Sequence, residues 1–245
     1  GIMDNELLAG KSAQYGPNIS HILSDLKDVA VETNAKLAKK LGIPQSTAVT
    51  CIKPSGTVSQ LVDSASGIHA RHSEYYYRTV RGDNKDPLTQ FMKDQGIYNE
   101  PDVTKPDTTT VFTFPIKAPS NCIDRNAMTA IEQLEMWLIY AKDWCEHKPS
   151  VTISVRDEEW MDVGAWVWKH FDYCSGVSFL PHFEHIYKQA PYQEVEQGDY
   201  LELKQVMPTS IDWTKLSEYE TEDNTTGTQE LSCTADACEI VDIAS

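Results

Sequence analysis

The sequence has no apolar run of about 18 residues, the length that a membrane-spanning helix requires. Its first residues also lack the basic and apolar pattern of a secretory signal peptide. We therefore expect a cytoplasmic protein that makes no contact with a membrane.

Positive charge is scarce. The chain has 21 Lys and Arg against 37 Asp and Glu, which gives a formal net charge of -16. Such a protein repels polyanions, so we expect no binding of DNA or RNA through a basic face. A single nucleotide held by backbone amides is compatible with this charge.

Two common glycine-rich nucleotide motifs are missing, namely Gly-x4-Gly-Lys-Ser/Thr and Gly-x-Gly-x-x-Gly. What remains is the composition of a soluble globular protein, 245 residues long, 40% hydrophobic and 24% charged. That length is enough for a real core in one large or two small domains. Because the chain begins with Gly1 in what reads as mid-domain sequence, we expect a processed, split or truncated polypeptide.

The segment most informative about function is residues 50–60. Residues 46–52 are apolar and β-branched and predict a buried strand, and residues 57–62 predict a short helix. Between them lies the tight turn Pro54-Ser55-Gly56-Thr57. A strand, turn and helix start can bind an anion, because free amides and the positive helix end face the turn. The alternative is a turn that merely ends the strand, and the local sequence leaves both open.

Hydrophobic periodicity predicts the other elements. Helices are expected at 19–41, 86–94, 126–144 and 158–173, and strands at 74–81, 108–115, 150–155 and 176–180. Strands that alternate with long helices predict an α/β fold with a substantially parallel sheet or barrel. Helix 19–41 is expected to cover one side of a sheet. Ligands in such folds bind at the carboxyl ends of strands, where we expect the turn at 54–57.

Two pairs of histidines lie three residues apart, His69 with His72 and His182 with His185. A metal site at the first pair would need a further ligand, and none is evident nearby, so a metal site is not favoured there. For the second pair a satisfied surface or core role is favoured. The helix at 158–173 carries three tryptophans, which suit either a stacking platform or core packing, and core packing or an interface is favoured.

The six cysteines fall into two groups. Four lie in ordinary segments and are expected to be reduced structural thiols: Cys51, Cys122, Cys145 and Cys174. We expect residues 1–205 to form one α/β unit and residues 206–245 a flexible tail. Cys233 and Cys238 lie in this tail. They suit a zinc half-site, a structural disulfide or an electron-carrying dithiol, and the dithiol fits the flexibility and the pairing best.

An ordered series of segments resembles the C-terminal part of the monomeric adenosylcobalamin-dependent (class II) ribonucleoside-triphosphate reductases. The segments are AVTCIKPSGTV at 48–58, GIH at 67–69, YYYRTVR at 75–81, DPL at 86–88, TVFTFPIK at 110–117, SVTI at 150–153, SFLPHF at 178–183 and QAP at 189–191. The resemblance extends over nearly the whole chain, is weakest at 192–230, and ends in the Cys-x4-Cys of the tail.

The resemblance implies a ten-stranded α/β barrel with a radical-bearing finger loop, of which this chain supplies the C-terminal part. It implies that Pro54, Ser55, Gly56 and Thr57 bind the phosphates of a ribonucleoside triphosphate. It also implies that the tail dithiol re-reduces an active-site disulfide and is recharged by thioredoxin or a similar dithiol reductant. Adenosylcobalamin would generate the thiyl radical that starts replacement of the ribose 2′-hydroxyl by hydrogen.

The sequence departs from the family in one respect. The finger-loop motif Asn-x-Cys-x-Glu, which carries the thiyl cysteine, is absent. We therefore expect the chain to be inactive alone and to work with an N-terminal fragment of the same reductase. The alternatives are a diphosphate-using member of the same superfamily, and a non-catalytic nucleotide-binding or thiol-relay module.

Overall fold

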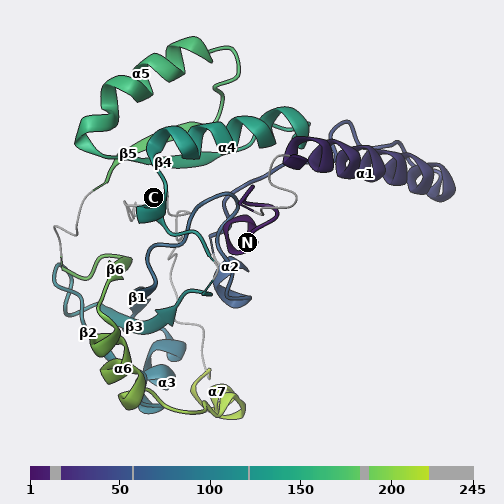
Figure 1. Ribbon diagram of the computed structural model, residues 1–245. Helices are drawn as coiled ribbons and strands as arrows, with labels where there is room; N and C mark the ends of the chain where they lie inside the picture. Colours follow the sequence, from purple (N-terminus) through teal and green to yellow (C-terminus); the bar gives the residue numbers. More distant parts are fainter. Residues whose placement is uncertain (12–17, 57, 121, 183–187, 221–245) are drawn as a thin grey trace, which may run out of the picture. The chain divides into compact units, whose positions relative to one another are not determined.

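The computed structural model describes residues 1–11, 18–56, 58–120, 122–182 and 188–220 (Figure 1). The chain divides into two compact units. The first unit comprises residues 1–71 and 119–183, and the second comprises residues 72–118 and 184–245. Among the described residues, none of the helices combines the length and the apolar character needed to cross a membrane.

The first unit is built around two parallel strands, and its elements follow the chain in this order. They are η1 (Ile2–Asp4), α1 (Ile19–Leu41), α2 (Val58–Leu61), η3 (Arg125–Ala127), α4 (Ala130–Asp143), β4 (Val151–Val155), η4 (Asp157–Glu159), α5 (Trp160–Lys169) and β5 (Val177–Pro181). Strands β4 and β5 pair in parallel, with Val151 opposite Val177 and Val155 opposite Pro181. The helix that joins them, α5, makes this a βαβ unit, so the parallel arrangement expected from the sequence is confirmed here.

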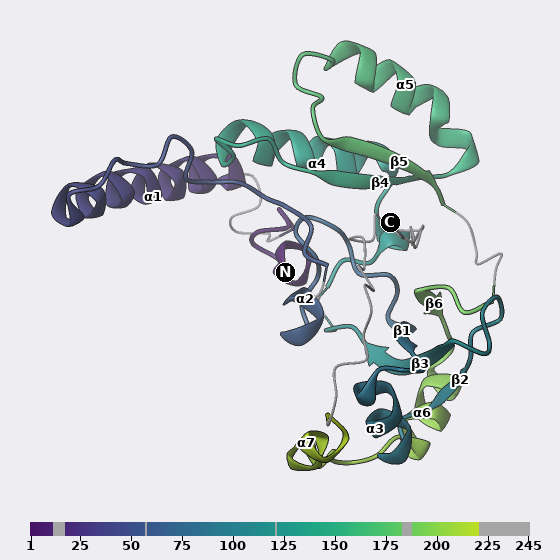
Figure 2. The same ribbon diagram turned by 180° about the vertical axis from the view of Figure 1, so that it is seen from behind.

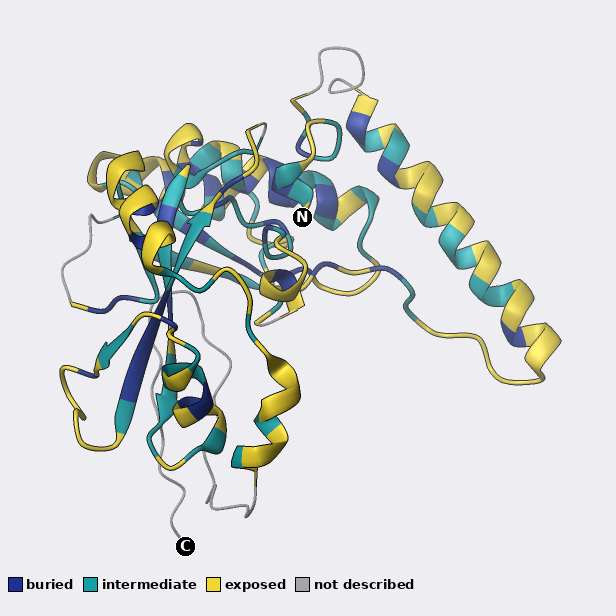
Figure 3. Cartoon of the chain, turned by 90° about the horizontal axis from the view of Figure 1, so that it is seen from below, coloured by how far each residue is buried: buried dark blue, intermediate teal, exposed yellow. Residues whose placement is uncertain are grey.

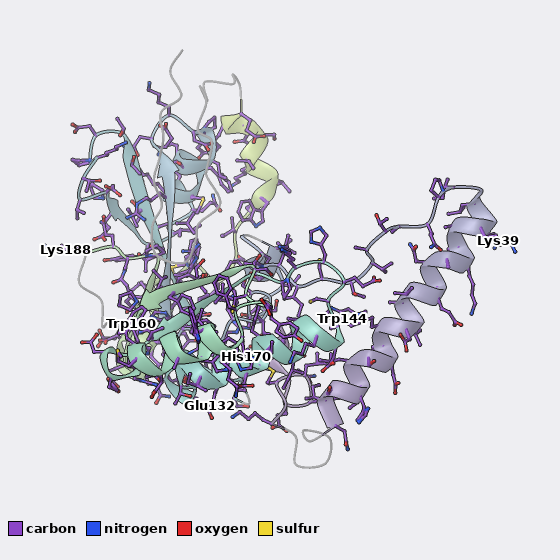
Figure 4. All side chains as sticks on the ribbon, turned by 90° about the horizontal axis from the view of Figure 1, so that it is seen from above. Lys39, Glu132, Trp144, Trp160, His170 and Lys188 are labelled. Atoms are coloured by element: carbon purple, nitrogen blue, oxygen red, sulfur yellow. The ribbon has the colours of Figure 1, made fainter. Side chains whose placement is uncertain are left out.

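The core of the first unit lies between β4 and α4, which runs alongside the two strands (Figures 1 and 2). Alternate residues of β4 are buried, as a strand with one face in the core requires, and Leu134 and Trp137 of α4 are fully buried. Figure 4 shows α4 between Glu132 and Trp144. The predicted helix at 126–144 begins later than expected, because Thr129 and Glu132 form a capping box that starts it at residue 130.

Helix α1 confirms the predicted range, with Asn18 as N-cap and Gly42 in the left-handed conformation at its end. Its first turns are buried at Ile19 and Leu23. Farther along, its apolar side chains are largely exposed, as Figure 3 shows for most of the helix. These side chains are Leu26, Val29, Leu37 and Leu41. The prediction that the helix covers a sheet is wrong, because the first turns of α1 pack against the end of helix α4, where Ser20 donates to Asp143.

The predicted strand at 46–52 is also wrong, although its alternating burial is real. Thr50 and Ile52 are buried and Cys51 is exposed, as in an extended chain with one face in the core. The carbonyl of Thr50 accepts from the amides of residues 146 and 147, and that of Ile52 accepts from Ser150. These partners belong to a loop, so the segment is extended and hydrogen-bonded without being part of a ladder.

The second unit is an antiparallel sheet in the order β2-β3-β1-β6 with helices beside it. Its elements are β1 (Tyr75–Asp83), α3 (Pro87–Asp94), β2 (Asn99–Pro101), β3 (Thr109–Lys117), β6 (Tyr192–Glu194), α6 (Gln197–Val206), η5 (Trp213–Lys215) and α7 (Leu216–Tyr219). The long strands β1 and β3 pair from Tyr75 opposite Lys117 to Asp83 opposite Thr109. The expected parallel sheet is therefore wrong for this unit, since periodicity predicts that strands exist but not in which direction neighbours run.

An ion pair with a buried carboxylate links β1 to the segment that follows β2. Arg81 of β1 donates through Nε to Asp102, which follows β2, at 2.8 Å. Burial alone would raise the pKa of Asp102, but hydrogen bonds from Thr104, Arg81 and Lys105 hold it well below its ordinary value. The pair therefore stays ionised and ties the strands together.

Candidate functional site

The structure describes three of the four residues predicted to bind phosphate, and Thr57 lies outside the described residues. Helix α2 follows at Val58, so the predicted short helix is confirmed. Pro54 and Gly56 are exposed, and a Cβ placed on Gly56 would meet no atom within 4 Å. The turn therefore presents bare backbone to open space, as close approach of a ligand to the main chain requires.

Ser66 holds the turn from behind. The amide of Ser55 donates to Ser66 Oγ at 2.8 Å, and Ser66 Oγ donates to the carbonyl of Ser55 at 3.1 Å. The side chain of Ser55 in turn accepts from the amide of Ser59 in α2 at 3.3 Å. The sequence-based expectation of free amides needs a correction, because the amide of Ser55 is already used, and an anion would meet Gly56 and the residues after it.

Gly67 brings the next segment against the turn. Its φ is +57°, and a Cβ there would lie 2.9 Å from the carbonyl oxygen of Lys53. Only glycine fits both the left-handed backbone and the close approach. The family motif at 67–69 therefore has a packing role behind the turn.

His69 connects this segment to the sheet. Its Nδ1 lies 3.0 Å from the carbonyl of Ser66, and its Nε2 accepts from the amide of Thr152 in β4 at 2.9 Å. These partners place the proton on Nδ1. Burial lowers the pKa of His69, although the bond to Ser66 opposes the shift, so the ring is neutral.

Both ring nitrogens of His69 already have backbone partners, which speaks against a metal site at the first histidine pair. Within the described part of the chain, no three His, Cys, Asp or Glu side chains are grouped as a metal site would require. His72 instead lies against the ring of Tyr192 at 5.6 Å between centroids. Of the second pair, His185 lies outside the described residues.

The turn lies beside the beginning of β4. Ile52 pairs with Ser150 through the backbone, and Lys53 Nζ donates to Ser150 Oγ at 2.9 Å. The expectation that the turn lies at the carboxyl ends of the strands is therefore wrong. Two residues after Ile52, at Pro54, the segment turns away from β4. The turn therefore stays near the first residues of β4 and does not reach its carboxyl end.

A buried ion pair fixes the segment that leads to Ser66. Arg71 is 5% exposed and donates to both carboxylate oxygens of Asp4, each at 2.9 Å, and to Asp63 at 3.0 Å. Asp4 also accepts from the amide of Ala65 at 2.7 Å. Burial alone would raise the pKa of Asp4, but the bonds from Arg71 and Ala65 outweigh it and lower that pKa. Sequence reasoning missed this pair, because residues so far apart give no local signal.

The four cysteines of the described chain are free thiols, as expected. Burial raises the pKa of the Cys145 thiol to about 11, and it also raises the pKa of Cys122 and Cys174. A thiol with a raised pKa is a poor nucleophile. Cys51 is exposed rather than buried. Cys233 and Cys238 lie outside the described residues, so the structure does not test their role.

The tryptophans of α5 have separate environments, although Trp160 and His170 mark the ends of a single helix in Figure 4. Trp166 is buried, donates through Nε1 to Glu135 at 2.6 Å and stacks on His170. Trp168 is 85% exposed. The favoured expectation is core packing or an interface; core packing is confirmed for Trp166, and an interface role of the other two tryptophans stays a prediction.

Known proteins resemble the chain in sequence and in fold, although no protein-family model matches it. A probable adenosylcobalamin-dependent ribonucleoside-triphosphate reductase of Dictyostelium discoideum is 31% identical over 230 residues, which are 89% of this chain. The adenosylcobalamin-dependent ribonucleoside-triphosphate reductase of Euglena gracilis is 30% identical over 178 residues, 71% of this chain. A crystal structure of a B-12 dependent (class II) ribonucleotide reductase superposes with a TM-score of 0.73 at 25% identity and covers 85% of this chain.

The chain belongs to this reductase family. It spans about 30% of the length of the Dictyostelium relative, 24% of the Euglena relative and 29% of the chain in the crystal structure. The resemblance read from the sequence is confirmed, and so is the mixture of helix and sheet. The chain corresponds to a C-terminal portion of the class II reductases.

Proposed function

We propose that the chain supplies the substrate-phosphate turn and the tail dithiol of a reductase that converts ribonucleoside triphosphates to 2′-deoxyribonucleotides. The observation that carries this proposal is the turn at 54–56, which exposes its backbone on one side and is held by Ser66 on the other. A rigid, exposed turn loses little entropy when it binds a ligand. Membership of the reductase family supports the chemistry.

The turn would bind the phosphates through Gly56 and Thr57 at the start of α2. Gly56 gives an oxyanion access to the backbone, and a threonine hydroxyl can donate a further hydrogen bond. Ser55 contributes by shape, since its backbone is bonded to Ser66 and its side chain to Ser59. The turn therefore positions substrate and does no bond-breaking itself.

The remaining parts of the site follow from the family. We propose that residues 1–205 complete a ten-stranded α/β barrel with an N-terminal portion of the reductase, and that the expected tail at 206–245 carries the dithiol. The first part of that range needs a correction, because η5 and α7 lie there and Phe91 of α3 contacts Trp213 and Tyr219. Residues 221–245 lie outside the described residues. Cys233 and Cys238 would reduce the active-site disulfide by thiol exchange and become a disulfide themselves. Thioredoxin or a similar dithiol would then reduce them, which requires a reducing compartment, and we propose the cytoplasm.

Adenosylcobalamin is the cofactor that we propose for the assembled enzyme, where it supplies the radical. Its cobalt is held by its own corrin ring, so it needs no cluster of protein ligands. The described residues offer no metal cluster, and no contact to the cofactor is assigned to them. The proposed share of this chain is to bind and orient the substrate and to deliver electrons.

Complementation tests this function. The chain is combined with the part of the Dictyostelium relative that it does not match, and deoxyribonucleotide formation is measured with adenosylcobalamin, a dithiol and a ribonucleoside triphosphate. Product should form only when all of these are present. Nucleotide binding without product in any complemented mixture would overturn the catalytic proposal and favour the non-catalytic module. Competition between nucleoside di- and triphosphates separates the two substrate classes.

Gly56→Val tests the turn within the same assay. The valine side chain would occupy the space that the phosphates need, so the KM for substrate should rise roughly tenfold or more with a smaller change in kcat. Gly164→Val is the matched control, because Gly164 also has no neighbour within 4 Å of its Cβ position but lies in α5. An unchanged KM for Gly56→Val would leave the turn a structural one.

A further inference from the structure

A second group of polar side chains lies at the other end of β4 from the turn. Because β4 and β5 are parallel and in register, they end side by side at Val155 and Pro181. The amide of His182 donates to the carbonyl of Val155 at 2.8 Å, which fixes the backbone after β5. Arg156 directly follows β4. Carboxyl ends of parallel strands are where ligands of α/β proteins collect.

Arg156 also connects this edge to η3. Its guanidinium donates to the carbonyls of Asn126 at 3.1 Å and Met128 at 3.4 Å. Arg125, the first residue of η3, thereby lies close to the same edge, and its charge acts on His182 together with that of Arg156. Arg125, Arg156 and His182 thus belong to three segments of the first unit that meet at this edge, in a protein of net charge -16.

The third basic side chain of this group is that of His182, which directly follows β5. Its Nε2 is buried and has no hydrogen-bond partner within the part of the chain that the structure describes. Burial, followed by the charges of Arg125 and Arg156, lowers the pKa of His182, and Glu159 opposes the shift. A buried polar atom without a partner is costly, so it points to a ligand.

Glu159 is a carboxylate that acts on this group, and both of its oxygens are already used. Glu159 accepts from the amide of Ala130 at 2.9 Å with one oxygen and from the amide of Arg156 at 2.9 Å with the other. Its approach to the Arg156 guanidinium is longer, at 3.7 Å. Glu159 therefore caps backbone amides more than it neutralises the basic side chains.

We propose that Arg125, Arg156 and His182 form a binding site for a phosphate group, separate from the turn at 54–56. Arginine guanidinium groups match the geometry of phosphate oxygens, and a protonated imidazole adds a further donor. An arriving dianion reverses the local field, so His182 takes up a proton from solvent as the ligand binds. The site goes beyond the proposed function, which assigns phosphate only to the turn.

Side-chain NMR of the labelled chain tests the site directly. The pKa of His182 is measured without ligand, with inorganic phosphate, with a ribonucleoside triphosphate and with sodium chloride at matched ionic strength. Phosphate should raise the pKa of His182 by about one unit or more, because an opposite charge within a few ångströms favours the protonated ring. The chloride sample should show a smaller rise. A rise of the His182 pKa with the triphosphate alone would assign the site to a nucleotide. A rise with both ligands would assign it to a phosphate group, and either result supports the site.

Variants show whether the arginines carry the binding. Arg125→Gln and Arg156→Gln should each weaken phosphate binding roughly tenfold by calorimetry, as loss of a charge-assisted hydrogen bond predicts. Lys169→Gln is the control, since it removes the same charge from the exposed end of α5 and should change nothing. Because Arg156 also bonds to η3, the wild-type titration and Arg125→Gln decide the case if Arg156→Gln fails to fold.

Two results would overturn the site. One is a His182 pKa that responds equally to phosphate and chloride, which is ionic screening or an adventitious ion only. The other is equal weakening by Lys169→Gln and Arg125→Gln. Gly56→Val should leave the His182 response unchanged, so the failure of the turn and the failure of this site are distinguishable.

Discussion

His69 joins two segments through the two nitrogens of one ring. Nε2 accepts from the amide of Thr152, at the point where the neighbouring extended segment has turned away at Pro54. The imidazole thus takes the place of a backbone acceptor at this edge of β4. Because Nδ1 faces the carbonyl of Ser66, the same ring anchors the serine that holds the turn at 54–56.

This bonding makes the stability of the first unit depend on pH. The folded-state pKa of His69 lies below its ordinary value of 6.5, so its contribution is complete above that pH and is lost as pH falls through the lowered pKa. In His69→Gln, the amide oxygen can still accept from Thr152, and no titration occurs. We expect the variant to be less stable at neutral pH by about 1 to 3 kcal/mol. The difference should shrink on acidification, and denaturant unfolding at several pH values measures it; parallel pH curves would contradict this role.

Glycine substitutions separate backbone strain from close approach. Gly67 and Gly42 both have left-handed backbones, but only Gly67 has a neighbour, the Lys53 carbonyl at 2.9 Å from the Cβ position. Gly42→Ala should therefore cost about 1 to 2 kcal/mol, the strain alone. Gly67→Ala should cost at least about 1 kcal/mol more, because the turn must move as well. If both variants lose the same free energy of unfolding, measured by heat or denaturant, the Lys53 carbonyl moves aside at little cost.

At the scale of elements, α1 packs in the core with its first turns, while most apolar side chains of its far half are exposed. Leu23 is 2% exposed, while Leu37 in the same helix is 51% exposed. Leu23→Ala should cost about 2 to 5 kcal/mol in free energy of unfolding through a cavity. Leu37→Ala should stay within about 0.5 kcal/mol in the chain alone. Similar losses for both would mean that the far half of α1 is packed in solution.

The positions of most helices and strands were predictable from the sequence, but what each of them packs against was not. The period of apolar residues located α1, α3, β1, β3, β4 and β5, because each buries one face or stripe. The same period failed for residues 46–52, where alternation reflects an extended chain with loop partners. It also gave no strand direction, which depends on pairing between distant segments and produced the antiparallel second sheet.

The candidate site was predictable only in its exposed part. Pro54, Ser55 and Gly56 form a local pattern that predicts a turn, and their binding of phosphate stays a prediction. Ser66, Gly67 and His69 act behind them through contacts that cross from one segment to another, and Arg71 reaches Asp4 at the far end of the unit's sequence. Contacts of this kind leave no spacing signal, so only the structure reveals them.

At the scale of the whole molecule, the chain covers about 30% of the Dictyostelium relative's length. A barrel that spans a longer reductase would need strands from the rest of that protein. The exposed apolar half of α1 agrees with a chain that has partners to meet in the assembled enzyme. The family's finger-loop motif is also missing from the sequence, so the proposed activity belongs to the assembly.

Cys233 and Cys238 can be tested in the complete enzyme by their dependence on the reductant. In the complemented reductase, Cys233→Ser or Cys238→Ser should abolish multiple turnover driven by thioredoxin, because in the proposed shuttle a protein reductant reaches the active-site disulfide only through the tail. A small dithiol can enter the site itself, so turnover with it should largely survive. Cys51→Ser removes an exposed thiol elsewhere and should leave both activities intact. Equal loss with both reductants would place these cysteines in the chemistry or the fold, and no loss with either would end the shuttle proposal.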